Sequence, residues 1–198
     1  MDNFLEILYN RQVETPSDIN EHLPTLRKYT EGCDLVLELG VRGICSTWAF
    51  LAGRPKKLIS YDIYPPSNWG GDISLVEYVA SQEGIEYEFV IADVLETELP
   101  ECDLMFIDTW HTYDQLSAEL KMHSSKVKKY IILHDTTSYG FVNESIAHAN
   151  SFKQRLSGKQ GLKLAIDEFL SSNTNWSIHK VFNNNNGLTV LISNAHLL

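Results

Sequence analysis

The chain has 198 residues, of which 43% are apolar and 21% are charged, so it is long enough for a single domain with a sizeable core. Lys and Arg number 16 against 26 Asp and Glu, and the net charge of -10 argues against nucleic acid as a partner. Three cysteines without C-x-x-C spacing favour a reducing, cytoplasmic location. We find no N-terminal apolar h-region and no membrane-length apolar stretch, so no membrane partner is expected.

The first part of the chain, residues 1–31, is expected to form a helical cap that precedes the main domain at 32–198. Ser17 is the predicted N-cap, and apolar residues recur at helical spacing until Gly32 ends the run.

An apolar run at 34–39 predicts a strand buried on both faces, followed by a glycine turn and a helix at 45–53. Gly40 and Gly43 would let the backbone turn tightly and come close to a ligand. Ser46 or Thr47 is the predicted cap of the helix.

Glu38 stands at the end of this strand and gives the turn the spacing E-x-G-x-x-G. An acidic group there repels a pyrophosphate and suits a cationic ligand, which distinguishes the turn from the dinucleotide fingerprint. The spacing resembles motif I of the class I S-adenosylmethionine-dependent methyltransferases. That resemblance implies that Glu38 faces the methionine part of the cofactor and that Gly40, Gly43 and Ser46 belong to the cofactor site.

Further strands are expected at 57–61, 87–92, 103–107 and 130–133. They alternate with helices capped by Asp72 and Thr112, so the sequence predicts an α/β fold with a doubly wound, mostly parallel, Rossmann-like sheet. Two last strands, 176–182 and 188–192, are joined only by a short Asn/Gly loop, which predicts an antiparallel hairpin. A sheet finished in this way resembles the class I methyltransferase fold, whereas a nicotinamide-binding Rossmann domain continues with parallel strands.

Acidic residues stand at or directly after the ends of five strands: Glu38, Asp62, Asp93, Asp108 and Asp135. Ligands of open α/β sheets bind outside the carboxyl ends of the strands, so we expect these side chains to converge on one crevice. Asp62, about twenty residues after the glycine turn, is placed to accept hydrogen bonds from ribose hydroxyls, and Asp93 from an adenine amino group. Taken singly, each acid also fits a turn or a helix-capping carboxylate.

The segments 106–113 and 132–137 are similar to the metal-dependent small-molecule O-methyltransferases, which include catechol O-methyltransferase and bacterial sugar and macrolide enzymes. The resemblance implies S-adenosylmethionine and Mg²⁺ as cofactors. It assigns the following residues: the metal ligands Asp108, Asp135 and Thr136, the general base His111, and Trp110, which stacks on adenine. Asp108 and His111 are the expected catalytic residues, and Asp108 is also expected to bind the cofactor. The sequence departs from this family at Ile44, where a further glycine is common, and at Thr136, where Asn or Asp is common.

Each of these aromatic and imidazole side chains also has a structural alternative. His111 would then pack beside the helix cap at Thr112, and Trp110 would belong to the core. For His134 we favour a packed, hydrogen-bonded residue over a ligand. A loop at 138–160 is expected to overhang the crevice, with a pocket formed by these aromatic residues: Tyr64, Trp69, Tyr139 and Phe141.

The expected function is transfer of a methyl group from S-adenosylmethionine to a hydroxyl of a small molecule or sugar, with nitrogen as an open alternative acceptor. Two other functions are considered, a non-catalytic S-adenosylmethionine-binding module and an NAD-dependent oxidoreductase. The sequence leaves a homo-oligomer open.

Overall fold

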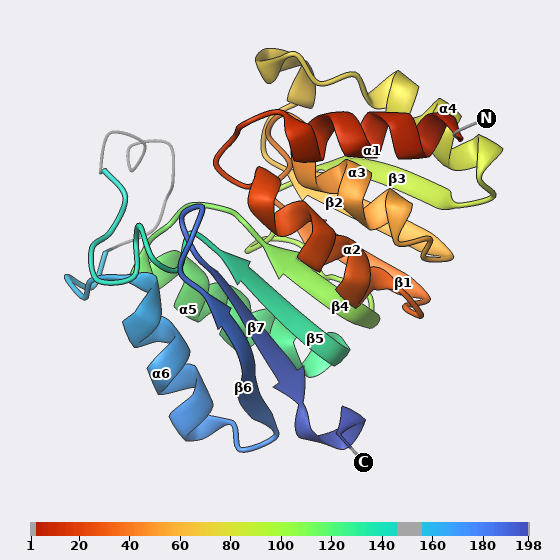
Figure 1. Cartoon of the computed structure of the whole chain (residues 1–198). Helices are drawn as coiled ribbons and strands as arrows, with labels where there is room; N and C mark the ends of the chain where they lie inside the picture. The colour runs from red at the N-terminus through yellow and green to blue at the C-terminus, as the bar shows by residue number, and fades with distance from the viewer. Residues whose placement is uncertain (1–2, 146–155, 198) are drawn as a thin grey trace.

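The structure is a computed structural model, and it describes residues 3–145 and 156–197 (Figure 1). Within these residues the strands form one sheet in the order β3-β2-β1-β4-β5-β7-β6. The strands are β1 (Leu35–Leu39), β2 (Lys57–Asp62), β3 (Glu86–Ile91), β4 (Cys102–Ile107), β5 (Val127–His134), β6 (Trp176–Phe182) and β7 (Leu188–Ser193). Strands β1 to β5 pair in parallel, and β7 pairs antiparallel with both β5 and β6. The predicted doubly wound sheet with a C-terminal hairpin is therefore confirmed.

Helices cover both faces of this sheet, which gives three layers (Figure 1). They are α1 (Phe4–Glu14), α2 (Leu23–Thr30), α3 (Cys45–Ala52), α4 (Ile73–Gln82), α5 (Tyr113–His123) and α6 (Leu162–Ser172). Successive strand residues point to opposite faces, so Val36 packs in the cluster under α1 to α4, and Leu37 packs in the cluster under α5 and α6. Leu5 of α1 and Leu26 of α2 share the first cluster with Val36. The N-terminal helices thus lie on the sheet itself.

Local details differ from the sequence predictions. The Ser17 hydroxyl accepts hydrogen bonds from the amides of Ile19 and Asn20 and so supports the short 3₁₀ helix η1 (Asn20–His22), whereas α2 has His22 as its N-cap. Strand β5 begins at Val127, earlier than expected, because Val127 pairs with Cys102 of β4.

Helix α6 was not predicted. The predicted loop at 138–160 lies partly outside the described residues, since 146–155 are not described; its described ends contain no helix or strand. Among the helices that the structure describes, none is long and apolar enough to cross a membrane.

The sheet order reverses between β1 and β4, and the backbone is tightest at this point. Gly40 follows β1 with a φ of 87°, and a Cβ atom there would collide with the carbonyl oxygen of Asp108, directly after β4. The amide of Asp108 donates to the carbonyl of Leu39 at 2.8 Å, and the amide of Gly40 donates to the carbonyl of Tyr61 at 2.9 Å. Only glycine fits here, and its absence of a side chain brings the ends of β1 and β4 together.

We predict that Gly40→Ala destabilises the protein much more than Gly84→Ala. Gly84 also has a positive φ of 71° but open space around its Cβ direction, so the matched substitution should cost about 1–2 kcal/mol from backbone strain alone. Gly40→Ala adds the collision with Asp108 and should cost at least about twice as much. Urea unfolding measures both. Equal losses would show that the close approach is not a constraint.

Candidate active site

A cavity of about 200 Å³ lies at the carboxyl ends of β1, β2, β3 and β4, where ligands bind in open α/β sheets. Its lining includes these predicted cofactor residues: Gly40, Asp62, Asp93, Asp108 and Trp110. Tyr64 and Trp69 of the expected aromatic pocket also line it, and their rings meet edge to face at 6.1 Å. The other lining residues were not predicted as site residues; they are Arg42, Tyr61, Ile63, Ala92, Val94, Thr109 and Gln115.

The Asp62 carboxylate organises the rim of this cavity. One oxygen accepts hydrogen bonds from the amides of Val41 at 2.9 Å and Arg42 at 3.0 Å, and the other accepts from the amide of Tyr64 at 2.9 Å. Asp62 therefore holds the glycine turn and the loop after β2 in fixed relation. Asp93 accepts from the amide of Leu95 at 2.9 Å and faces the same cavity.

Glu38 does not converge on this crevice, contrary to the prediction. Its side chain is 0% exposed and accepts hydrogen bonds from three hydroxyls, those of Ser46 at 2.5 Å, Thr47 at 2.9 Å and Ser60 at 2.6 Å. Glu38 lies within β1, so its side chain points into the layer beneath α3 and not past the strand end. Burial raises the pKa of Glu38 to about 7, although the three hydroxyls act in the opposite direction.

The start of α3 also differs from the prediction. Ser46 and Thr47 donate to Glu38 and do not cap the helix, whose N-cap is Ile44 with no side-chain hydrogen bond. Ile44 is 6% exposed and has a φ of 62°, a strained conformation for a β-branched residue. A Cβ at Gly43 would meet only the carbonyl oxygen of Trp69 at 3.8 Å, so crowding does not require glycine there.

We predict that Glu38→Gln removes part of the pH dependence of stability. The folded pKa of about 7 lies above the ordinary value of 4.5, so the folded protein binds this proton more tightly than the unfolded chain. The resulting stability is present below pH 4.5 and is lost as the pH rises to about 7, a change of up to about 3 kcal/mol. Denaturant unfolding at pH 4.5 and 8 should show a smaller loss in Glu38→Gln than in the wild type or in the exposed control Glu98→Gln. If Glu38→Gln loses as much stability between pH 4.5 and 8 as the wild type, burial does not raise the pKa of Glu38.

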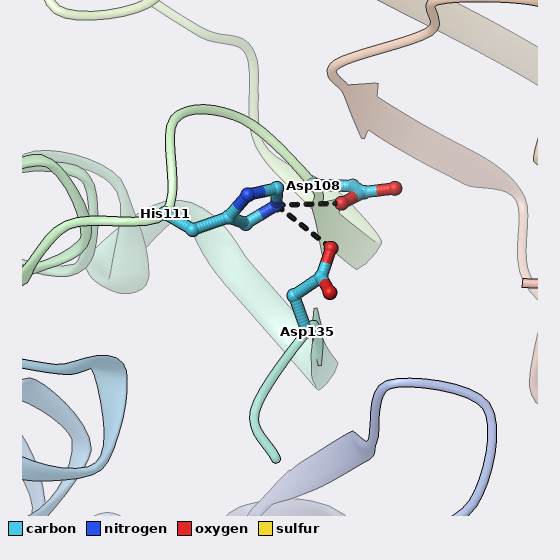
Figure 2. A group of neighbouring side chains, drawn as sticks. All are labelled: Asp108, His111 and Asp135. Atoms are coloured by element: carbon cyan, nitrogen blue, oxygen red, sulfur yellow. Dashed lines mark hydrogen bonds and ion pairs between the residues drawn. The ribbon is translucent and has the colours of Figure 1, made fainter. Parts of the chain in front are cut away.

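Beside the cavity, two carboxylates and an imidazole meet at the ends of β4 and β5 (Figure 2). The Nε2 atom of His111 lies 3.1 Å from Oδ1 of Asp108 and 3.0 Å from Oδ2 of Asp135. His134 also contacts the cluster, with Nδ1 at 3.2 Å from Oδ1 of Asp108 and Nε2 at 3.3 Å from the carbonyl oxygen of Asn185. His134 is 2% exposed, in keeping with a packed, hydrogen-bonded role.

The other side of the His111 ring is held by the segment after β5. The carboxylate of Glu144 lies 3.0 Å from Nδ1, and the Tyr139 ring stacks on the imidazole with 4.9 Å between centroids and 3° between planes. Glu144 was missed because it lies far from His111 in sequence, in a stretch without a periodic pattern. The side chain of Phe141, which was expected to help form an aromatic pocket, is 75% exposed.

The charged groups of this cluster shift one another's pKa values. Burial disfavours the imidazolium form of His111, but hydrogen bonds to Asp108 and Glu144 outweigh it and raise the pKa of His111 to about 10. The pKa of His134 is raised to about 11 in the same way, since Asp108 and Asp135 outweigh its burial. Burial would raise the pKa of Asp108, but the two imidazoles hold it below its ordinary value. In this arrangement the neighbouring carboxylates favour the imidazolium form of both histidines.

The donor set fits a divalent cation. Ligand atoms of Asp108, His111 and Asp135 lie within 4.8 Å of one another. Asp135 is 5% exposed, and its buried Oδ1 has no hydrogen-bond partner among residues 3–145 and 156–197. An orphaned carboxylate oxygen is a ready metal ligand. Thr136, the predicted third ligand, accepts a hydrogen bond from the Thr189 hydroxyl at 3.0 Å.

Several solved structures are similar to the chain. An O-methyltransferase from Bacillus cereus in complex with S-adenosylhomocysteine has a TM-score of 0.57 and 13% identity, over 98% of this chain and 91% of its own. A methyltransferase from Podospora anserina bound to S-adenosylhomocysteine has a TM-score of 0.56 and 14% identity, over 98% of this chain and 88% of its own. Magnesium protoporphyrin IX methyltransferase from Synechocystis, with bound S-adenosylhomocysteine, has a TM-score of 0.58 and 14% identity, over 96% of this chain and 95% of its own.

No protein-family model matches the sequence, and no curated protein matches it. The similarity to solved structures is therefore a similarity of fold, and it covers nearly the whole chain. The strand order β3-β2-β1-β4-β5-β7-β6 agrees with it. The chain has the class I S-adenosylmethionine-dependent methyltransferase fold.

Proposed function

We propose that the protein is an S-adenosylmethionine-dependent methyltransferase that methylates a hydroxyl of a small molecule or sugar. The observation that carries this proposal is the junction of the cavity with the Asp108–His111–Asp135 cluster, at the carboxyl ends of β1 to β5. Asp108 belongs to both, so a bound cofactor and an acceptor hydroxyl would meet beside it. Similarity to methyltransferases that bind S-adenosylhomocysteine supports the choice of cofactor.

The cavity offers groups suited to each part of the cofactor. Asp62 would accept hydrogen bonds from the ribose hydroxyls, and Asp93 from the adenine amino group, because both carboxylates face the cavity. Trp110 supplies a flat apolar surface for adenine. Gly40 lines the cavity with main-chain atoms alone. Glu38 contributes to the cofactor site indirectly, since its hydrogen bonds to Ser46 of α3 and Ser60 of β2 hold the elements on either side of the glycine turn.

Asp108, Asp135 and His111 would hold a divalent cation such as Mg²⁺ or Mn²⁺. When bound, such an ion lowers the pKa of an acceptor hydroxyl and offsets the negative charge that keeps His111 protonated. In the arrangement described above, the two carboxylates favour a proton on Nε2 of His111, and a protonated Nε2 cannot accept another. We therefore assign His111 two states, a cation between the two carboxylates and a neutral imidazole whose Nε2 lone pair can bind the ion or take the acceptor's proton, but not both at once.

The proposal is tested by isothermal titration with S-adenosylhomocysteine and, separately, with NAD⁺. We expect micromolar binding of the first ligand and none of the second. Asp93→Ala should weaken binding about tenfold to a hundredfold, because it removes a charged hydrogen-bond acceptor worth about 1.5–3 kcal/mol. Asp34→Ala, which alters an exposed carboxylate paired with Lys56, is the matched control and should bind like the wild type. Binding of NAD⁺ alone would overturn the proposal in favour of an oxidoreductase.

The metal assignment is tested separately with Mn²⁺, whose binding is followed by electron paramagnetic resonance. Asp135→Asn should weaken Mn²⁺ binding by at least about tenfold, because an anionic ligand is lost. Asp167→Asn, on the exposed face of α6, is the control and should change nothing. Failure of the wild type to bind Mn²⁺ would overturn the metal assignment.

A further inference from the structure

Glu144 is joined to His111 by both backbone and side-chain contacts. Its carboxylate accepts from Nδ1 of His111 at 3.0 Å and from the His111 amide at 3.3 Å, and its own amide donates to the His111 carbonyl at 2.9 Å. A single residue therefore fixes both the main chain and the ring of His111. Because the carboxylate occupies Nδ1, Nε2 is left to face Asp108 and Asp135.

Tyr139 restrains the same ring from a second direction. Its ring lies parallel to the imidazole, which leaves His111 little freedom to rotate about its side-chain bonds. The backbone of Tyr139 is itself anchored, since its amide donates to the carbonyl of Asp135 at 3.0 Å and its carbonyl accepts from the amide of Leu162 at 2.9 Å. The stacking residue is thus tied to the start of α6 and to a member of the cluster.

The segment between these two residues is pinned to the helices on that side of the sheet. The Asn143 side-chain oxygen accepts from the amides of Tyr113, at the start of α5, and Gly161, just before α6, at 3.0 and 2.8 Å. Glu144 therefore sits next to a residue held by two rigid elements. Partners that orient a histidine are most effective when their own positions are fixed in this way.

We propose that Tyr139 and Glu144 are positioning residues of the active site, which clamp His111 so that Nε2 faces the place where the acceptor hydroxyl and the cation would meet. This inference rests on the function proposed above. Among the contacts of Tyr139, Glu144 and His111 described above, Asp108 is the residue that also lines the cofactor cavity. The clamp should consequently affect His111 and the metal cluster while leaving cofactor binding unchanged.

The test is nuclear magnetic resonance of protein labelled with ¹⁵N in its histidine rings, with His111→Gln used to assign the His111 signals. The wild type should show an Nδ1–H resonance of His111 that is shifted downfield by the carboxylate and protected from exchange. Glu144→Ala and Tyr139→Ala should lose or broaden it. Tyr139→Phe keeps the stacking ring and should retain it, and Glu98→Ala is the exposed control. Glu144→Gln keeps an acceptor without the charge, so its resonance should remain but move upfield.

Mn²⁺ affinity and S-adenosylhomocysteine affinity are measured on the same variants. We expect Glu144→Ala to weaken Mn²⁺ binding by about tenfold to a hundredfold and to leave S-adenosylhomocysteine affinity within about twofold. A wild type without the protected resonance, or a Glu144→Ala variant that keeps it, would overturn the clamp. If Glu144→Ala does not fold, the Glu144→Gln variant is used in its place. An Nδ1–H resonance at the wild-type position in that variant would overturn the clamp. Failure of the wild type to bind S-adenosylhomocysteine would contradict the proposed function without altering the reading of the resonance.

Discussion

The close approach of Gly40 to the backbone of Asp108 is the constraint on which the site depends. It brings the carboxyl ends of β1 and β4 together where the strand order reverses, and thereby joins the cavity to the acidic cluster. Asp62 then fixes the turn around Gly40 through backbone amides, and Glu38 fixes it from below through hydroxyls. The functional groups are therefore held by backbone packing and by buried polar bonds, which cost much more to break than exposed ones.

Charge compensation explains the composition of the cluster. The carboxylates of Asp108, Asp135 and Glu144 surround His111, and His134 adds a second imidazole beside Asp108. The imidazolium forms of the two histidines, which the carboxylates favour, would offset most of this negative charge. On the function proposed above, the same acids would bind a dication, which would replace one form of positive charge with another. Such a replacement would link metal binding to the protonation of His111.

Sequence reasoning was reliable where a residue's role follows from the strand that precedes it. The parallel strands, the hairpin and the placement of Asp62, Asp93 and Asp108 on one cavity follow from apolar runs that end in polar residues. Glu38 was misplaced because it lies one residue inside its strand, where the side-chain direction is set by the pleat. Glu144 could not be predicted, because only the tertiary path of the segment after β5 brings it to His111.

The proposed function requires that the cavity between Gly40, Asp62 and Asp108 receives S-adenosylmethionine. A crystal structure of the protein with S-adenosylhomocysteine and Mn²⁺ tests this requirement. We expect ribose hydroxyls within hydrogen-bond distance of Asp62, adenine between Asp93 and Trp110, and the ligand's sulfur directed toward Asp108. A ligand bound elsewhere, or one that turns its sulfur away from Asp108, would contradict the assignment of this crevice as a methyl-transfer site.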